Sequence, residues 1–365
     1  MPLRRALTDW TVVVPPAALV LLVLTWGRTL PMGLVVLVAV ALAGAVLAAV
    51  HHAEVIAHRV GEPFGSLVLA VAVTIIEVAL IVTLMISGDA VKTAPLARDT
   101  VFAAVMITCN GIVGLCLLRS SLRGHVAVFN AQGTGGALAT VATLATLSLV
   151  LPGFTTTRPG PEFSTPQLAF AAVSSLVLYG VFVSVQTVRH RDYFLPVTSE
   201  GTVVTEETHA DPPSTRRAWA SVGLLLVALV AVVGDAKSVS PTLERGIAAA
   251  GLPVAFVGVI IALLVLAPET LAAFRAAGRD RTQTSLNLAY GSAIASIGLT
   301  IPAVAVASLV LDRPLYLGLG PTEIVLFALT VVAGILTLVH GLATLLQSAV
   351  HLSIFAAYIF LATNP

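Results

Sequence analysis

The sequence predicts an all-α membrane protein with about eleven transmembrane helices, in which one N-terminal helix precedes two inverted five-helix repeats. Composition is the first observation behind this fold class. The 365 residues are 58% hydrophobic and 10% charged, whereas a soluble domain has about 25% charged residues. The second observation is that apolar runs, such as Gly33 to Val50, approach or reach the ~20 residues that a helix needs to cross the bilayer. An outer-membrane barrel would show short alternating segments instead.

The elements follow from a membrane-length window moved along the chain. Arg4 and Arg5 precede the first run, but no cleavage motif follows them, so we expect an uncleaved helix within residues 1–32. A first repeat is expected over 33–188 and a second over 218–365. The predicted spans are residues 11–30, 33–53, 65–87, 100–119, 134–152, 167–188, 218–234, 250–271, 285–311, 322–339 and 342–361.

Residues 189–217 form the long polar segment between the repeats. Glu200, Glu206, Glu207 and Asp211 make it acidic, and we interpret it as a solvated cytoplasmic linker, with cation sensing by Glu206 and Glu207 as the alternative. Lys and Arg are more frequent in the segments on the same side as the N-terminus. The positive-inside rule therefore predicts a cytoplasmic N-terminus and an external C-terminus.

Charge and composition also limit the partners. The formal net charge of +1, without basic and aromatic residues interleaved, excludes nucleic acid as an expected partner. The bilayer is the partner that the apolar runs predict, and nothing in the sequence indicates an oligomeric state.

An internal repeat is the third observation that predicts the fold class. Each half has a glutamate, then glycine and proline at the same intervals, then an apolar run with a glutamate inside it. The two series are Glu54, Gly61, Pro63, Glu77 and Glu244, Gly251, Pro253, Glu269. Because five spans is an odd number, the second set enters the membrane in the opposite orientation. Inverted repeats are typical of secondary transporters, which bind substrate near the midplane.

Glu77 and Glu269 are the strongest candidates for chemistry. An ionised carboxylate inside a bilayer costs several kcal/mol, so it is expected to face a cavity, bind a cation or carry a proton. Two such groups at one site can hold a cation when ionised and protons when the cation leaves. Competition for the same oxygens predicts cation/proton exchange. A structural ion pair is the alternative, but no basic residue lies in the same spans.

Further oxygen ligands are expected near these acids. Thr74 lies three residues before Glu77 and so on the same helical face. Pro268 is expected to kink or break its helix and to free the carbonyl of Leu264. Ser292, Ser296 and Thr300 form a polar stripe on the next span, and Asn110 lies in the corresponding span of the first half. Hydroxyls that bond only to their own helix are the alternative.

Histidines give no enzyme signature. His51, His52, Glu54 and His58 lack the H-E-x-x-H order of zinc proteases, so we interpret them as a polar helix end rather than a metal site. His340 and His351 are expected at the membrane interface, with proton relay as the alternative. We expect neither an enzyme nor a resident cofactor.

The segments EVIAHRVGEPFGSLVLAVAVTIIEVAL (54–80) and FVGVIIALLVLAPETLAAFRAAGRDRTQTSLNLAYGSAIASIGLTIP (256–302) resemble the signature repeats of calcium/proton antiporters in the calcium/cation antiporter superfamily. The similarity is greatest to the bacterial branch that exchanges sodium, potassium or calcium for protons, and covers nearly the whole chain. It implies a bacterial inner-membrane antiporter, calcium being the first candidate ion and sodium or potassium the alternative. A cation channel is a weaker alternative.

The resemblance also assigns residues. It implies that Glu77 and Glu269 bind cation and proton. The chain departs from the family pattern where Thr74 and Leu266 replace asparagine, where Thr270 replaces histidine and where Ala295 replaces glutamine. Fewer oxygen ligands are therefore expected than in the family at large.

Overall fold

The computed structural model describes residues 9–28, 30–61, 64–88, 90–197, 213–253 and 255–364. These residues are almost entirely helical. The acidic residues of the predicted linker, from Glu200 to Asp211, lie outside the described ranges, so the interpretation of the linker stays a prediction.

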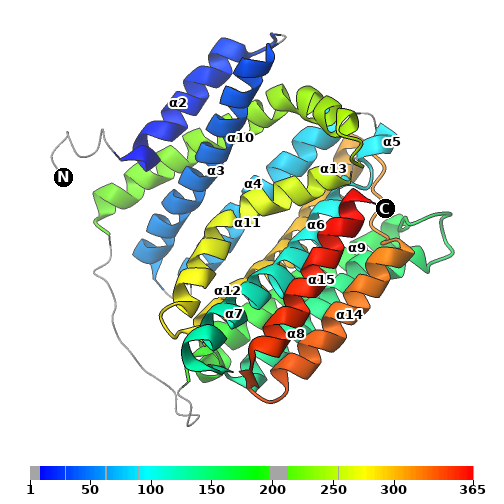
Figure 1. Cartoon of the computed structure of the whole chain (residues 1–365). Helices are drawn as coiled ribbons and strands as arrows, with labels where there is room; N and C mark the ends of the chain where they lie inside the picture. The colour runs from blue at the N-terminus through cyan, green and yellow to red at the C-terminus, as the bar shows by residue number, and fades with distance from the viewer. Residues whose placement is uncertain are drawn as a thin grey trace. The chain divides into compact units, whose positions relative to one another are not determined.

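The chain forms two compact units. Unit 1 is built from residues 1–93 and 209–257 and contains α2 (Trp10–Thr25), α3 (Met32–Val60), α4 (Phe64–Ser87), α5 (Ala90–Thr93) and α10 (Thr215–Ala249). α10 follows the linker in sequence but packs with α2, α3 and α4. The units therefore do not coincide with the two halves of the sequence (Figure 1).

Unit 2 is built from residues 94–208 and 258–365. Its first part is α6 (Leu96–Met106), η1 (Ile107–Ile112), α7 (Val113–Gly124), β1 (Ala127–Val128), α8 (Ala131–Ala145), η2 (Thr146–Val150), η3 (Leu151–Gly153), α9 (Thr165–Ser184), η4 (Val185–Arg189) and η5 (Arg191–Phe194). Its second part is α11 (Phe256–Ala277), apart from its first two residues, then α12 (Thr282–Ala295), η6 (Ser296–Thr300), α13 (Ile301–Leu311), α14 (Pro321–Leu338), β2 (Leu342–Ala343) and α15 (Leu345–Thr363). β1 and β2 pair antiparallel, with Ala127 opposite Ala343.

Ten helices within the described ranges are long and apolar enough to cross a membrane. The remaining predicted span, residues 11–30, corresponds to α2, which is shorter, with 16 residues. The predicted all-α membrane fold is therefore confirmed.

The predicted end of one span is wrong. Hydropathy places that end at residue 234, but α10 continues through Asp235, Lys237 and Pro241 to Ala249. Two polar side chains lower the local hydropathy without ending the helix. The Asp235 side chain is buried, and the Lys237 ammonium lies 5.4 Å from the centre of the Trp26 ring, which stabilises a cation through the ring quadrupole.

Polar contacts join the ends of three helices in unit 1. Oδ1 of Asp9 caps α2 by accepting hydrogen bonds from the Thr11 hydroxyl at 2.7 Å and the Thr11 N–H at 3.1 Å. These bonds, the hydroxyl foremost, lower the pKa of Asp9. Nε2 of His52 lies 2.9 Å from the Thr11 carbonyl oxygen, and Nδ1 lies 3.2 Å from the Ser221 hydroxyl. His52 thus connects α3 to both α2 and α10.

The paired glycines of the sequence repeat both have positive φ. Gly61 follows α3 with φ +78°, and Gly251 follows α10 with φ +70°. Glycine adopts positive φ without the steric cost that a Cβ imposes. Each glycine therefore ends a long helix at an equivalent place in the repeat, just before the helix that carries Glu77 or Glu269.

Two long helices of unit 2 contain a wider π-helical segment near their middle. η1 lies between α6 and α7, and η6 lies between α12 and α13. Pro302, the second residue after η6, has no N–H to donate to the carbonyl four residues earlier, which favours an altered hydrogen-bond ladder. Single π turns within α-helices occur often at functional sites.

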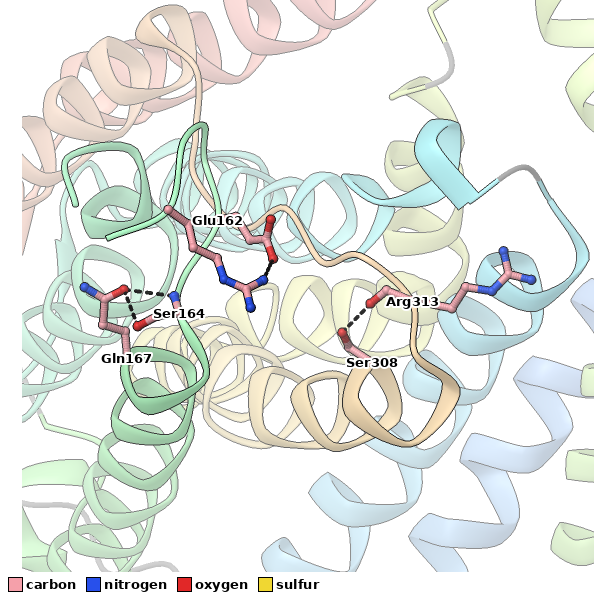
Figure 2. A network of polar contacts seen from close by, with 6 residues as sticks. Glu162, Ser164, Gln167, Ser308 and Arg313 are labelled. Atoms are coloured by element: carbon pink, nitrogen blue, oxygen red, sulfur yellow. Dashed lines mark hydrogen bonds and ion pairs between the residues drawn. The ribbon is translucent and has the colours of Figure 1, made fainter. Parts of the chain in front are cut away.

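Side-chain caps fix the loops around α9 and α13 (Figure 2). Oε1 of Gln167 accepts hydrogen bonds from both the N–H and the hydroxyl of Ser164, each at 2.9 Å, which satisfies polar groups at the start of α9. Arg158 forms an ion pair with Glu162 in the preceding loop. At the end of α13, the Ser308 hydroxyl donates to the Arg313 carbonyl at 2.6 Å.

Candidate functional site

Glu77 lies on the buried face of α4 in unit 1. Its side chain is 4% exposed, and that of Thr74, one turn earlier, is 7% exposed. The same face continues with buried Leu80, while Val71 and Ile75 on the other side of the helix are exposed. The expectation that Thr74 and Glu77 share one helical face is therefore confirmed. A carboxylate and a hydroxyl are suitable oxygen donors for a hard cation.

Glu269 belongs to the buried stripe of α11 in unit 2. Ala262, Leu266 and Ala273 are buried at three- and four-residue spacings around it, and Leu263 and Leu271 are exposed on the opposite side. Glu269 is half-buried, and its Oε2 atom is shielded from solvent. Each half of the chain thus directs one membrane glutamate to the protein side of its helix, which is the placement expected of a transport carboxylate.

α11 is continuous through Pro268, so the proline does not break the helix, and the kink predicted as the other outcome stays a prediction. The helix loses only one backbone hydrogen bond here, because Pro268 has no N–H to donate to the Leu264 carbonyl. The Thr270 hydroxyl donates to the Leu266 carbonyl at 2.7 Å, which occupies one backbone oxygen beside the acid. The Leu266 side chain is 3% exposed, so an apolar group stands where the resemblance implies an asparagine ligand.

Asn110 lies in η1 and is fully buried. Its Nδ2 donates to the Thr330 hydroxyl of α14 at 2.9 Å, and its Oδ1 lies 3.1 Å from Nδ1 of His351 on α15. Nε2 of His351 lies 3.1 Å from the Thr337 hydroxyl. The side chain expected to bind a cation is thus already bonded to two polar side chains, those of Thr330 and His351. His351 is 1% exposed within α15, whereas His340 is exposed. The placement of both at the membrane interface stays a prediction.

The serine stripe coincides with a π-helical segment. Ser296 is the first residue of η6 and Thr300 the last, and both are buried, whereas Ser292 in α12 is half-buried. α12 packs against η1, which carries Asn110. Unit 2 therefore brings together the two helices that the sequence predicts to line the site.

The pairing of Glu77 with Glu269 stays a prediction, because the two residues belong to different units. Within the described ranges, no group of three His, Cys, Asp or Glu side chains is placed to hold a metal ion. The interpretation of His51, His52, Glu54 and His58 as a helix end agrees with the bonds of His52 to backbone and serine.

Several buried polar residues were not predicted as functional. They are Asp235 in α10, Tyr290 in α12 and Thr330 in α14. Asp235 carries a signal that sequence reasoning can use, since an acid lies directly at the end of an apolar run. Tyr290 and Thr330 carry none, because such residues are common in membrane helices and the partner of Thr330, Asn110, comes from a distant segment.

The chain is similar to known proteins over most of its length. The model of the sodium/calcium exchanger protein family matches residues 30–188 and 220–364. The chain belongs to the sodium/calcium exchanger family. The first matched range contains Glu77 and the second contains Glu269. The predicted linker lies between the two ranges.

Members of the exchanger family resemble the chain over nearly its full length. "Putative ionic transporter y4hA" of Sinorhizobium fredii is 47% identical over 363 residues, which cover 98% of this chain and 96% of the relative. The sodium-potassium/proton antiporter ChaA of Escherichia coli is 35% identical, with 96% and 95% covered. The crystal structure of the H+/Ca2+ exchanger CAX has a TM-score of 0.69 at 16% identity, with 98% and 92% covered. These similarities identify a CAX-like cation antiporter of the exchanger family and its fold.

Proposed function

We propose that this exchanger is a secondary antiporter that exports a cytoplasmic cation in return for protons by alternating access. The observation that carries the proposal is the equivalent placement of Glu77 and Glu269. Each is the acid of a membrane helix that follows a positive-φ glycine, and each faces the protein side of that helix. The proposed reaction needs no resident cofactor.

The chemistry follows from the environment of these acids. A carboxylate shielded from water is stable when a cation neutralises it or when it carries a proton. When the cation leaves, the acid takes up a proton, and it must lose that proton before it binds the next cation. Because both ions use the same oxygens, neither moves without the other. Inverted repeats provide the two alternating orientations that exchange requires.

Calcium is the first candidate for the cation. Two carboxylates neutralise a divalent ion, and hydroxyl, carbonyl and water oxygens, with Thr74 and Ser296 as candidates, would supply the remaining ligands. Sodium or potassium is the second candidate. The apolar Leu266 at an expected ligand position favours it, as does the similarity to the sodium-potassium/proton antiporter of Escherichia coli.

Orientation is part of the proposal. The distribution of Lys and Arg supports a cytoplasmic N-terminus and an external C-terminus, and the bacterial relatives support the inner membrane.

Everted vesicles with an acidic lumen test the exchange. Adding calcium, sodium or potassium outside should raise the luminal pH for the transported ion, and Glu77→Gln or Glu269→Gln should abolish the response. Glu162→Gln is the matched control, because Glu162 lies in a loop outside the spans and pairs only with Arg158 among the described residues. Exchange that persists in either membrane variant would remove that glutamate from its role, and current without proton coupling would indicate a channel.

A further inference from the structure

Asp235 is an acid deep within the membrane part of unit 1 that the proposed exchange does not use. It is the twenty-first of the 35 residues of α10, and its side chain is 0% exposed. Ser221, which contacts His52 near the start of this helix, precedes it by 14 residues, or about 21 Å at 1.5 Å per residue. Asp235 is therefore far from the polar end of the helix bundle.

The packing around Asp235 is tight and apolar. At the adjacent Gly234, a Cβ atom would lie 2.3 Å from Cδ2 of Leu22, so α2 and α10 approach each other closely there. One turn further along α10, Val239 packs with Val35 and Val38 of α3. Two neighbouring helices thus contribute hydrocarbon on either side of the acid.

The carboxyl oxygens receive no hydrogen bond from any residue that the structure describes. The nearest hydroxyls along the adjoining helices are directed elsewhere. Thr25 donates to the Leu21 carbonyl at 2.8 Å, and Ser238 donates to the Gly234 carbonyl at 3.0 Å. The Lys237 ammonium, two residues from the acid, lies over the Trp26 ring. Among the described residues, these nearby donors are thus directed to helix carbonyls and to an aromatic ring rather than to the carboxylate.

The helices packed against α10 carry few titratable groups, and on α10 itself Lys237 lies two residues from the acid. α2 has no titratable side chain within Trp10–Thr25. The titratable side chains of α3 are confined to its C-terminal turns, at the end where His52 contacts Ser221. The titratable side chain of α4 is that of Glu77. The groups on α3 are His51, His52, Glu54, His58 and Arg59. α10 itself carries Arg216, Arg217, Lys237, Glu244 and Arg245. The side chain of Glu244 lies outside the described residues.

An ionised carboxylate accepts hydrogen bonds only, whereas its protonated form also donates one. In a setting of hydrocarbon and carbonyls, the charged form loses its hydration without replacement, and the neutral form can donate to a carbonyl of its own helix. We propose that Asp235 is a proton-binding site within unit 1 that keeps its proton at neutral pH, separate from the glutamates that exchange theirs. The proposal depends on the burial of Asp235. It does not depend on which cation the protein transports.

Infrared spectroscopy of the purified protein tests the proposal. At about pH 8, where an ordinary aspartate is ionised, the wild type should show the carbonyl-stretch band of a protonated carboxyl that Asp235→Asn lacks. Asp280→Asn is the matched control and should retain the band, because Asp280 is exposed and asparagine tolerates its positive φ of 58°. Identical bands in the wild type and Asp235→Asn would overturn the proposal, as would loss of the wild-type band on adding sodium.

Thermal unfolding provides a second readout. The folded protein keeps a proton that an unfolded aspartate releases above its ordinary pKa, so the stability of the wild type falls as the pH rises. The Tm of the wild type should therefore fall relative to that of Asp235→Asn between about pH 5 and pH 8. A constant difference would contradict a bound proton. If neither Asp235→Asn nor Asp235→Leu folds, the proposal also fails, because a neutral carboxyl tolerates a neutral replacement.

Discussion

Nδ1 of His351 lies 3.1 Å from Oδ1 of Asn110, although 241 positions of the chain separate the two residues. The amide nitrogen of Asn110 donates to Thr330, so its oxygen is the acceptor and Nδ1 of His351 carries the hydrogen. Nε2 then accepts from the Thr337 hydroxyl at 3.1 Å. The contact therefore orients the imidazole with its Nδ1–H toward Asn110, and it ties the π-helical segment of one half to two helices of the other.

His351→Phe should destabilise unit 2. The substitution removes the donor to Asn110 and the acceptor for Thr337, and leaves buried polar groups unsatisfied at a cost of about 1–3 kcal/mol each. A lower Tm of the detergent-solubilised protein would show this. Thr337→Val removes only one partner and should cost less. A His351→Phe protein as stable as the wild type would mean that the network contributes nothing.

The repeat glycines predict a backbone effect. Gly61→Ala and Gly251→Ala should each lower stability by about 1–2 kcal/mol, because positive φ brings Cβ close to the following carbonyl. Space does not explain the effect, since a Cβ at either position meets nothing within 4 Å. Gly223→Ala in the interior of α10 is equally unobstructed and should instead be stabilising by up to about 1 kcal/mol. Thermal unfolding distinguishes the two directions, and equal effects at Gly61 and Gly223 would contradict the explanation.

Gly258→Ala tests the close contact of α11 with α6. A Cβ at this position would lie 2.8 Å from the Thr100 nitrogen and 2.9 Å from the Asp99 carbonyl carbon, and backbone atoms cannot rotate away. We expect α11 to shift, with a loss of about 1–3 kcal/mol and slower exchange, because this helix also carries Glu269. Gly180→Ala on α9, where a Cβ meets nothing within 4 Å, is the control for both unfolding and vesicle exchange. Wild-type behaviour of Gly258→Ala would mean that the two helices separate without consequence.

Sequence patterns predicted what depends on local chain properties. Apolar runs gave the spans, and the order of Gly61 and Gly251 before the membrane acids indicated the repeat, because each signal lies within about thirty residues. The course of α10 through Asp235 was not predicted by hydropathy, because Asp235 and Lys237 together lower the local value, whereas helices from other parts of the chain bury Asp235. The bonds of Asn110 to Thr330 and His351 depend on tertiary packing. A single sequence contains no signal for such distant partners.

Leu266→Asn should move ion preference toward calcium. Leu266 is 3% exposed on the buried stripe of α11, one turn before Glu269, so an amide oxygen there adds a ligand of the kind that calcium prefers. If that ligand is worth about 1.4 kcal/mol, the ratio of the KM for calcium to that for sodium falls about tenfold. Leu263→Asn introduces the same side chain on the exposed side of the same helix and should leave the ratio unchanged. An equal change in both variants would attribute the effect to helix polarity, and no change in either would place residue 266 outside the ion path.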